Sequence, residues 1–154
     1  MSAHTRTATK DHIETATDPA AFAHWPKDVY EDMLANQGNG CVGTTLVSET
    51  DSLRVWHLHI APGARCGFHR HVNPYFWSAF ADGKARTYFS DGRVVEMEYT
   101  KGQTQHYHYD PGEYMLHSLE NIGDTELVFV TVEYLETPGV ALPIPDHVRL
   151  SDAA

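Results

Sequence analysis

Short segments rich in β-branched and aromatic residues constrain this chain more than any other feature. From residue 41 onward about eight or nine of them follow one another, with turn residues between them about every 8–12 positions. The clearest turn is Ser90-Asp91-Gly92, which joins two such segments as a hairpin. No long helical pattern lies between the segments. We therefore expect an all-β, antiparallel sandwich or small barrel and not a parallel α/β sheet.

The expected elements can be assigned along the chain from the residue patterns. The predicted strands cover 41–49, 53–60, 68–71, 75–80, 84–89, 93–99, 104–109, 113–119 and 126–135. Residues 61–67 contain a proline and two glycines, so they are predicted to form a tight loop. Apolar residues at helical spacing predict one helix over 26–36, and Asp18-Pro19 could open a short helical turn before it.

A chain of 154 residues has the length of a single domain with a core of its own. We divide it into an N-terminal arm with a short helix (1–39), a barrel (40–136) and an extended, proline-rich tail (137–154). The first 20 residues are polar and rich in threonine and alanine. They are predicted to form a mobile arm, of the kind that often docks on a partner subunit.

Charge and cysteine content exclude several classes of partner. Lys and Arg number 11 against 21 Asp and Glu, which gives a formal net charge of −10. This balance predicts that the protein binds neither nucleic acid nor an anionic membrane, because both need a basic face. Cys41 and Cys66 form no Cys-x-x-Cys motif, and we find no apolar stretch long enough for a signal or a membrane span. The sequence therefore predicts a reduced, cytoplasmic protein.

Histidine is unusually frequent, with 11 residues in the chain, and it recurs at a spacing that suits metal binding. Three pairs have the form His-x-His: His57 and His59, His69 and His71, and His106 and His108. Because side chains alternate along a strand, both members of a pair lie on one face and can bind one metal ion. His117 is an isolated candidate for a third ligand.

One of these pairs lies within a longer pattern. Gly63, His69, His71 and Gly83 fit G-x5-H-x-H-x(3,4)-E-x6-G, and His117 with Asn121 fits H-x3-N. Together they resemble the two-part signature of the cupin superfamily. The stretch from Phe68 to Leu135 is further similar to a group of small bacterial cupins, some of which are labelled beta-alanine degradation proteins.

The resemblance implies a fold, an assembly and a metal site. The fold would be a cupin double-stranded antiparallel β-barrel, jelly-roll-like, with a short N-terminal helical extension, and such barrels commonly form homodimers. The metal ligands would be His69, His71 and His117. The sequence departs from the family at its usual glutamate ligand, because the corresponding positions hold Tyr75 and Phe76. The second half of the signature is also longer than the family pattern.

Three neutral imidazoles leave a divalent metal its full positive charge and open positions for a ligand. The cofactor is expected to be one divalent transition metal; iron is favoured, and zinc, nickel, copper or manganese are alternatives. By resemblance, the first function is dioxygenase-type chemistry on a small organic acid or ketone. The alternatives are a zinc-type lyase, isomerase or hydrolase, and a non-catalytic cupin that binds a small ligand.

Further residues are assigned supporting roles. His106 and Tyr75 are candidate catalytic residues, and His106 or His108 could replace the missing glutamate. His57 and His59 are interpreted as the polar face of an ordinary strand, because no loop of the signature precedes them. Alternation places Glu113 on the same face as His117 but about 13 Å away along the strand, so it is expected at the rim.

Overall fold

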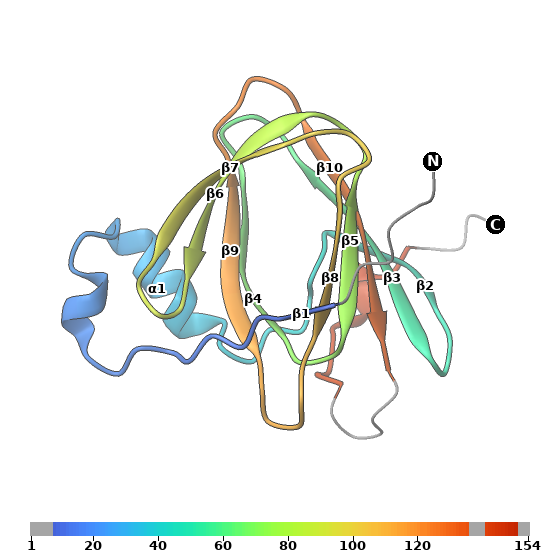
Figure 1. The fold of residues 1–154 in the computed structure, drawn as a ribbon, viewed down its shortest axis with the longest axis horizontal. Coiled ribbons are helices and arrows are strands. Elements are labelled where there is room, and N and C mark those ends of the chain that lie inside the picture. The colour runs from blue at the N-terminus through green and yellow to red at the C-terminus, as the bar shows by residue number, and fades with distance from the viewer. Residues whose placement is uncertain (1–7, 136–140, 151–154) are drawn as a thin grey trace.

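The computed structural model describes residues 8–135 and 141–150, and within them the chain forms two facing β-sheets (Figure 1). The six-stranded sheet contains, in order, β1 (Thr9–Lys10), β8 (Thr104–His108), β5 (Tyr75–Ala79), β10 (Leu127–Tyr134), β3 (Leu53–Ile60) and β2 (Thr45–Glu49). The four-stranded sheet contains β4 (Arg65–His71), β9 (Met115–Asn121), β6 (Gly83–Phe89) and β7 (Val94–Tyr99). Every pairing is antiparallel except that of β1 with β8.

The two sheets bury their facing sides, as the alternating sequence predicted. Along β10 every second residue from Leu127 to Glu133 is buried, and β3 repeats this pattern from Arg54 to Ile60. Leu58 and Phe129 from one sheet pack with Leu119 from the other in a common core. This double-stranded β-barrel confirms the predicted fold class.

Several strand boundaries differ from the predicted ones. β4 begins at Arg65 instead of Phe68, because Arg65 already pairs with Glu120 of β9. The pairing register shifts at a bulge between Cys66 and His69 and then continues. β9 begins at Met115, since the turn at Asp110-Pro111-Gly112 continues into Glu113, whose N–H donates to the Asp110 carbonyl at 2.9 Å. β2 begins only at Thr45.

Two glycines and an asparagine of the cupin-like signature have structural roles. Gly63 adopts a φ of 80°, which side-chain-bearing residues rarely tolerate. Gly83 lies so close to Leu127 that a Cβ atom would collide with that side chain. Asn121 donates from Nδ2 to the carbonyls of Ile60 and Thr125, both at 2.8 Å, and so fixes the turn that leads into β10.

The N-terminal helices cover the outer face of the four-stranded sheet (Figure 1). They are a 3-10 helix, Pro19–Phe22, capped by Asp18, and α1, Lys27–Ala35. Trp25 stacks on Phe68 with ring centroids 5.7 Å apart, and Val29 and Met33 of α1 pack in the same cluster. Both helical predictions are confirmed, and neither helix is long and apolar enough to cross a membrane.

The described part of the N-terminal arm is bound to its own barrel, which corrects the prediction of a mobile arm. Thr9 and Lys10 pair with β8, the Ile13 N–H donates to the Tyr114 carbonyl at 3.0 Å, and the Ala16 N–H donates to the Ser90 carbonyl at 2.9 Å. The arm thereby crosses from the six-stranded to the four-stranded sheet (Figure 1). Residues 1–7 lie outside the described part.

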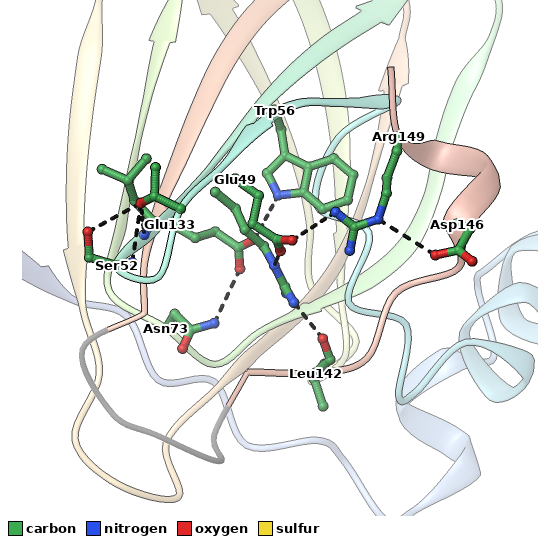
Figure 2. Close-up of polar contacts among 11 residues, drawn as sticks. Glu49, Ser52, Trp56, Asn73, Glu133, Leu142, Asp146 and Arg149 are labelled. Atoms are coloured by element: carbon green, nitrogen blue, oxygen red, sulfur yellow. Dashed lines mark hydrogen bonds and ion pairs between the residues drawn. The ribbon is translucent and has the colours of Figure 1, made fainter. Parts of the chain in front are cut away.

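The C-terminal segment 141–150 packs against β2 and β3. Arg149 bridges to Leu46 and donates to Glu49 at 2.8 Å, where Arg54 also donates (Figure 2). Ile144 contacts the cluster around Trp56. The rest of the predicted tail lies outside the described residues.

Candidate metal centre

Three of the predicted site residues converge between the sheets. His69 and His71 lie on the inner face of β4, and His117 lies opposite His69 on β9. One ring nitrogen of each lies within 4.8 Å of those of the other two. The structure therefore brings together His69, His71 and His117, which are separated by up to 48 positions in the sequence.

The spacing of these nitrogens fits a shared metal ion. The Nε2 atoms of His71 and His117 are 3.1 Å apart. Two nitrogens bound to one metal at about 2.0–2.1 Å, with a ligand angle between about 90° and 109°, lie about 2.8–3.4 Å apart. The Nδ1 atoms of both rings are buried and have no partner among the described residues. The donor set and its geometry thus fit a divalent metal bound through Nε2.

Local structure keeps the rings oriented and neutral. His69 Nδ1 lies 2.9 Å from the Gly67 carbonyl and donates to it, which leaves Nε2 free as a ligand. Burial lowers the pKa of His69 to about 4. Burial also lowers the pKa values of His71 and His117 well below their usual range. Neutral imidazole is the form that binds metals.

Helix α1 contributes to this arrangement through Asp32. Asp32 Oδ2 accepts a hydrogen bond of 2.8 Å from the Phe68 N–H, inside the β4 bulge that precedes His69. Gly67 lies against the same carboxylate. The helix therefore fixes the segment whose carbonyl orients His69, a role that no sequence motif around Asp32 indicated.

Tyr75 occupies the inward position that follows the His-x-His pair. Its ring stacks on His71, with centroids 4.0 Å apart and planes 14° apart. Burial raises its pKa well above the usual value, so its hydroxyl stays protonated. Phe76 points to the opposite face and packs on His106. Among the described residues, no carboxylate joins the three-histidine cluster.

The cluster opens into a small cavity between the sheets. Its volume is about 90 Å³. Most lining residues are apolar or aromatic, among them Leu58, Tyr75, Trp77, Phe89, Met115 and Phe129. The other polar residues in the lining are Thr87, Thr131 and Asp11 of the N-terminal arm. Ile13 of the arm packs on Tyr75, Tyr109 and Met115 and closes this end of the barrel.

The remaining predicted residues lie away from the cavity. His106 and His108 are on the outer face of β8, because their neighbour Tyr107 lines the cavity and strand residues alternate. The structure therefore does not bring His106 to the cluster, and it places His108 beside Asp110 at the surface. His57 and His59 lie on the outer face of β3, between the buried residues of that strand. Glu113 is at the rim, near Lys10.

Sequence reasoning missed a buried acid next to Tyr75. Glu133 is paired with Tyr75 across β10 and β5 and is only 3% exposed. Its carboxylate accepts a 2.7 Å hydrogen bond from Trp56 Nε1 and a 3.4 Å one from Asn73 Nδ2 (Figure 2). Burial raises its pKa. The available signal was a glutamate at an inward position of an alternating strand.

The fold and the inward-facing histidines define a β-barrel of the cupin class. Over 75 residues the chain is 35% identical to oxalate decarboxylase OxdC of Bacillus subtilis, a match that covers 47% of this chain and 18% of that protein. The chain thus matches less than a fifth of the length of OxdC. No family model matches the chain.

A solved cupin structure shows the same fold. A cupin domain from Bordetella pertussis is 27% identical with a TM-score of 0.52, and the match covers 58% of this chain and 88% of that domain. A double-stranded β-helix protein from Klebsiella pneumoniae is 26% identical with a TM-score of 0.48, covering 65% and 82%. The chain belongs to the cupin superfamily. Its likeness to proteins labelled for beta-alanine degradation stays a prediction.

Proposed function

We propose that this protein is a metal-dependent enzyme that acts on a small organic acid or ketone by dioxygenase-type chemistry. The observation that carries the proposal is the convergence of His69, His71 and His117 on the wall of an apolar cavity. The relative OxdC is described with Mn(II) centres, which supports a divalent metal without identifying it. When bound, such a metal supplies Lewis acidity and, if it is redox-active, reactivity toward O2.

The protein's own residues bind and shield the reacting centre. The histidines would hold the metal through Nε2, with His69 oriented by the Gly67 carbonyl. Tyr75 supports His71 by stacking and, because its hydroxyl stays protonated, can donate a hydrogen bond but cannot serve as a base near neutral pH. The aromatic wall, with Ile13 packed behind Tyr75 and Met115, gives the centre largely apolar surroundings.

The composition of the cavity favours oxygenation over hydrolytic or lyase chemistry. Hydrolysis at zinc needs water at the metal and usually a side chain that moves protons. Apart from the metal ligands, the described cavity wall contains one acidic side chain, Asp11, and no lysine or arginine. A substrate that already binds the metal as an anion can be oxidised by O2 without a side chain that removes a proton. A cupin that only binds its ligand is the alternative.

The metal site is tested with two matched double variants. The His69→Ala/His71→Ala variant is expected to stay folded and lose its metal, whereas His57→Ala/His59→Ala, which removes the same motif from the outer face of β3, should keep it. The measurement is elemental analysis of protein purified without an affinity tag, with circular dichroism as the folding control. Stoichiometric metal in the first variant contradicts the proposed site.

The reaction class is tested on the wild-type protein loaded with Fe(II). Oxygen consumption on addition of a β-diketone, β-keto acid or thiol acid supports dioxygenase chemistry. Zinc as the native metal, with no oxygen uptake, would instead support a zinc enzyme. Tight binding of such molecules without turnover under any metal would support a binding protein.

A further inference from the structure

The cavity contains a carboxylate that comes from outside the barrel. Asp11 follows β1 on the N-terminal arm and lines the cavity together with the three histidines. Burial raises its pKa, and the charge of Arg93 opposes this. No hydrogen bond contributes to that pKa. Burial raises the pKa values of Tyr75, Tyr107 and Tyr109, and the charge of the Asp11 carboxylate raises them further. Its position suggests that its charge acts on what enters the cavity.

Arg93, the basic group whose charge lowers the pKa of Asp11, does not cancel the charge of that carboxylate. Its guanidinium donates from Nε to Asp91 Oδ2 at 2.7 Å and lies over the ring of Phe89, which lines the cavity. Asp91 in turn raises the pKa of Asp11. Two carboxylates and one guanidinium therefore leave this end of the cavity with one net negative charge.

The cavity wall provides no other cation. Within the part of the chain that the structure describes, neither lysine nor arginine lines it. A divalent metal on three neutral imidazoles and the ionised Asp11 carboxylate in the same cavity together carry one net positive charge. A ligand with a single negative charge neutralises it, whereas a dianion would leave an uncompensated charge in an apolar enclosure, which is unfavourable.

The volume adds a limit on size. At about 90 Å³ the cavity is smaller than the roughly 150 Å³ apolar cavity that accepts benzene. We propose that the site takes a compact, largely apolar chelating molecule with one negative charge, and that Asp11 makes it discriminate against dianions. This inference rests on the proposed metal site.

The test uses two chelators that differ mainly in charge. Pyruvate and oxalate have the same number of non-hydrogen atoms and bind metals through two adjacent oxygens, but pyruvate is a monoanion and oxalate a dianion. Their affinities are measured by calorimetry on Zn²⁺-loaded protein at pH 8, well above the usual carboxyl pKa. Zinc retention is checked after each titration.

Three variants give the expected directions. Asp11→Asn should raise the oxalate-to-pyruvate affinity ratio about tenfold, and Arg93→Gln, which removes a positive charge at the same end, should lower it. Glu14→Gln removes an acid of the same arm that is 81% exposed and should leave the ratio unchanged. These three results together support the inference.

The two proposals fail in different ways. A ratio that is the same in Asp11→Asn and wild type, with one zinc bound in each, overturns the role of Asp11 and leaves the metal site intact. A higher oxalate-to-pyruvate affinity ratio in Arg93→Gln than in wild type also overturns the role of Asp11. This second variant keeps the test decisive even if Asp11→Asn does not fold. Failure of the wild-type protein to bind zinc overturns the metal site and this inference with it.

Discussion

The inner face of the four-stranded sheet and the outer face of the six-stranded sheet carry the same His-x-His motif in opposite surroundings. His69 is 3% exposed and faces a largely apolar cavity, while the side chain of His59 is 51% exposed and contacts Glu126. The four-stranded sheet is covered outside by α1, through Phe68 and Trp25. Among the described residues, the only helix against the six-stranded sheet is the short 3-10 helix Asp146–Val148, whose Val148 packs with Leu46 and Trp56. The His-x-His motif alone therefore does not predict a metal site. What decides is whether the motif lies on the buried inner face of a sheet.

Lowering the pH gives the largest expected difference between the two faces. The imidazole rings of His69, His71 and His117 on the inner face are buried in their neutral form, so acid should destabilise the fold through them. The pKa of His69 is about 4 in the folded protein and near 6.5 when unfolded, so below pH 6.5 the unfolded chain binds a proton that the folded one does not. Stability is therefore complete above about pH 6.5 and falls toward pH 4, by about 3 kcal/mol for His69 alone. His71 and His117 act in the same direction.

Urea unfolding of chelator-treated protein at several pH values measures this loss. The outer-face variant His57→Asn/His59→Asn should show the same loss as wild type, because it leaves the three buried inner rings unchanged. Equal stability of the metal-free wild type at pH 7.5 and 4.5 would mean that the inner rings are not buried as described.

The two outer faces should differ in how much a phenylalanine contributes. Phe68 is fully buried between the four-stranded sheet and the N-terminal helices, so Phe68→Ala should lower the free energy of unfolding by about 3–5 kcal/mol. Phe76 is half-buried on the six-stranded sheet, and Phe76→Ala should cost about 1 kcal/mol. Urea unfolding at pH 7.5 compares them. A large loss for Phe76→Ala would show that something covers that face in solution.

Single histidine variants compare the inner and outer faces by their effect on zinc affinity. His117→Ala removes one of three converging nitrogens and should weaken zinc binding at least about a hundredfold. His106→Ala, on the outer face of β8, should leave the affinity unchanged. Competition with a fluorescent zinc chelator gives both values. Equal loss in the two variants would place His106 at the metal despite its position.

The smallest expected effect concerns the helix behind the site. Asp32→Asn leaves a donor of the β4 bulge or of Asn36 without its acceptor, and should weaken zinc binding about tenfold by loosening the segment before His69. Asp28→Asn is the matched control on the same helix, since Asp28 contacts only the Arg65 side chain at 3.5 Å. Identical zinc affinities in both variants would limit Asp32 to a structural role.

Much of the fold could be predicted because alternation and turn residues are local signals. β3 spans the predicted residues, and α1 differs from its predicted bounds by one residue at each end. The predicted strand bounds were wrong where the pairing partner determines the end of a strand, as at the β4 bulge and the start of β9. The three-histidine cluster was predicted from spacing, whereas Asp11, Asp32 and Glu133 were not, because their roles arise from contacts with segments far away in the chain.

By itself, the sequence determined an antiparallel β-barrel of the cupin type and the three histidines that face one another within it. The reason is that side-chain alternation and glycine-dependent turns act over a few residues. Only the tertiary structure decided that His106 faces outward, that Tyr75 and not Phe76 stacks on His71, and that the arm returns Asp11 to the cavity. Such outcomes depend on strand register and on packing between distant segments, which local patterns do not encode.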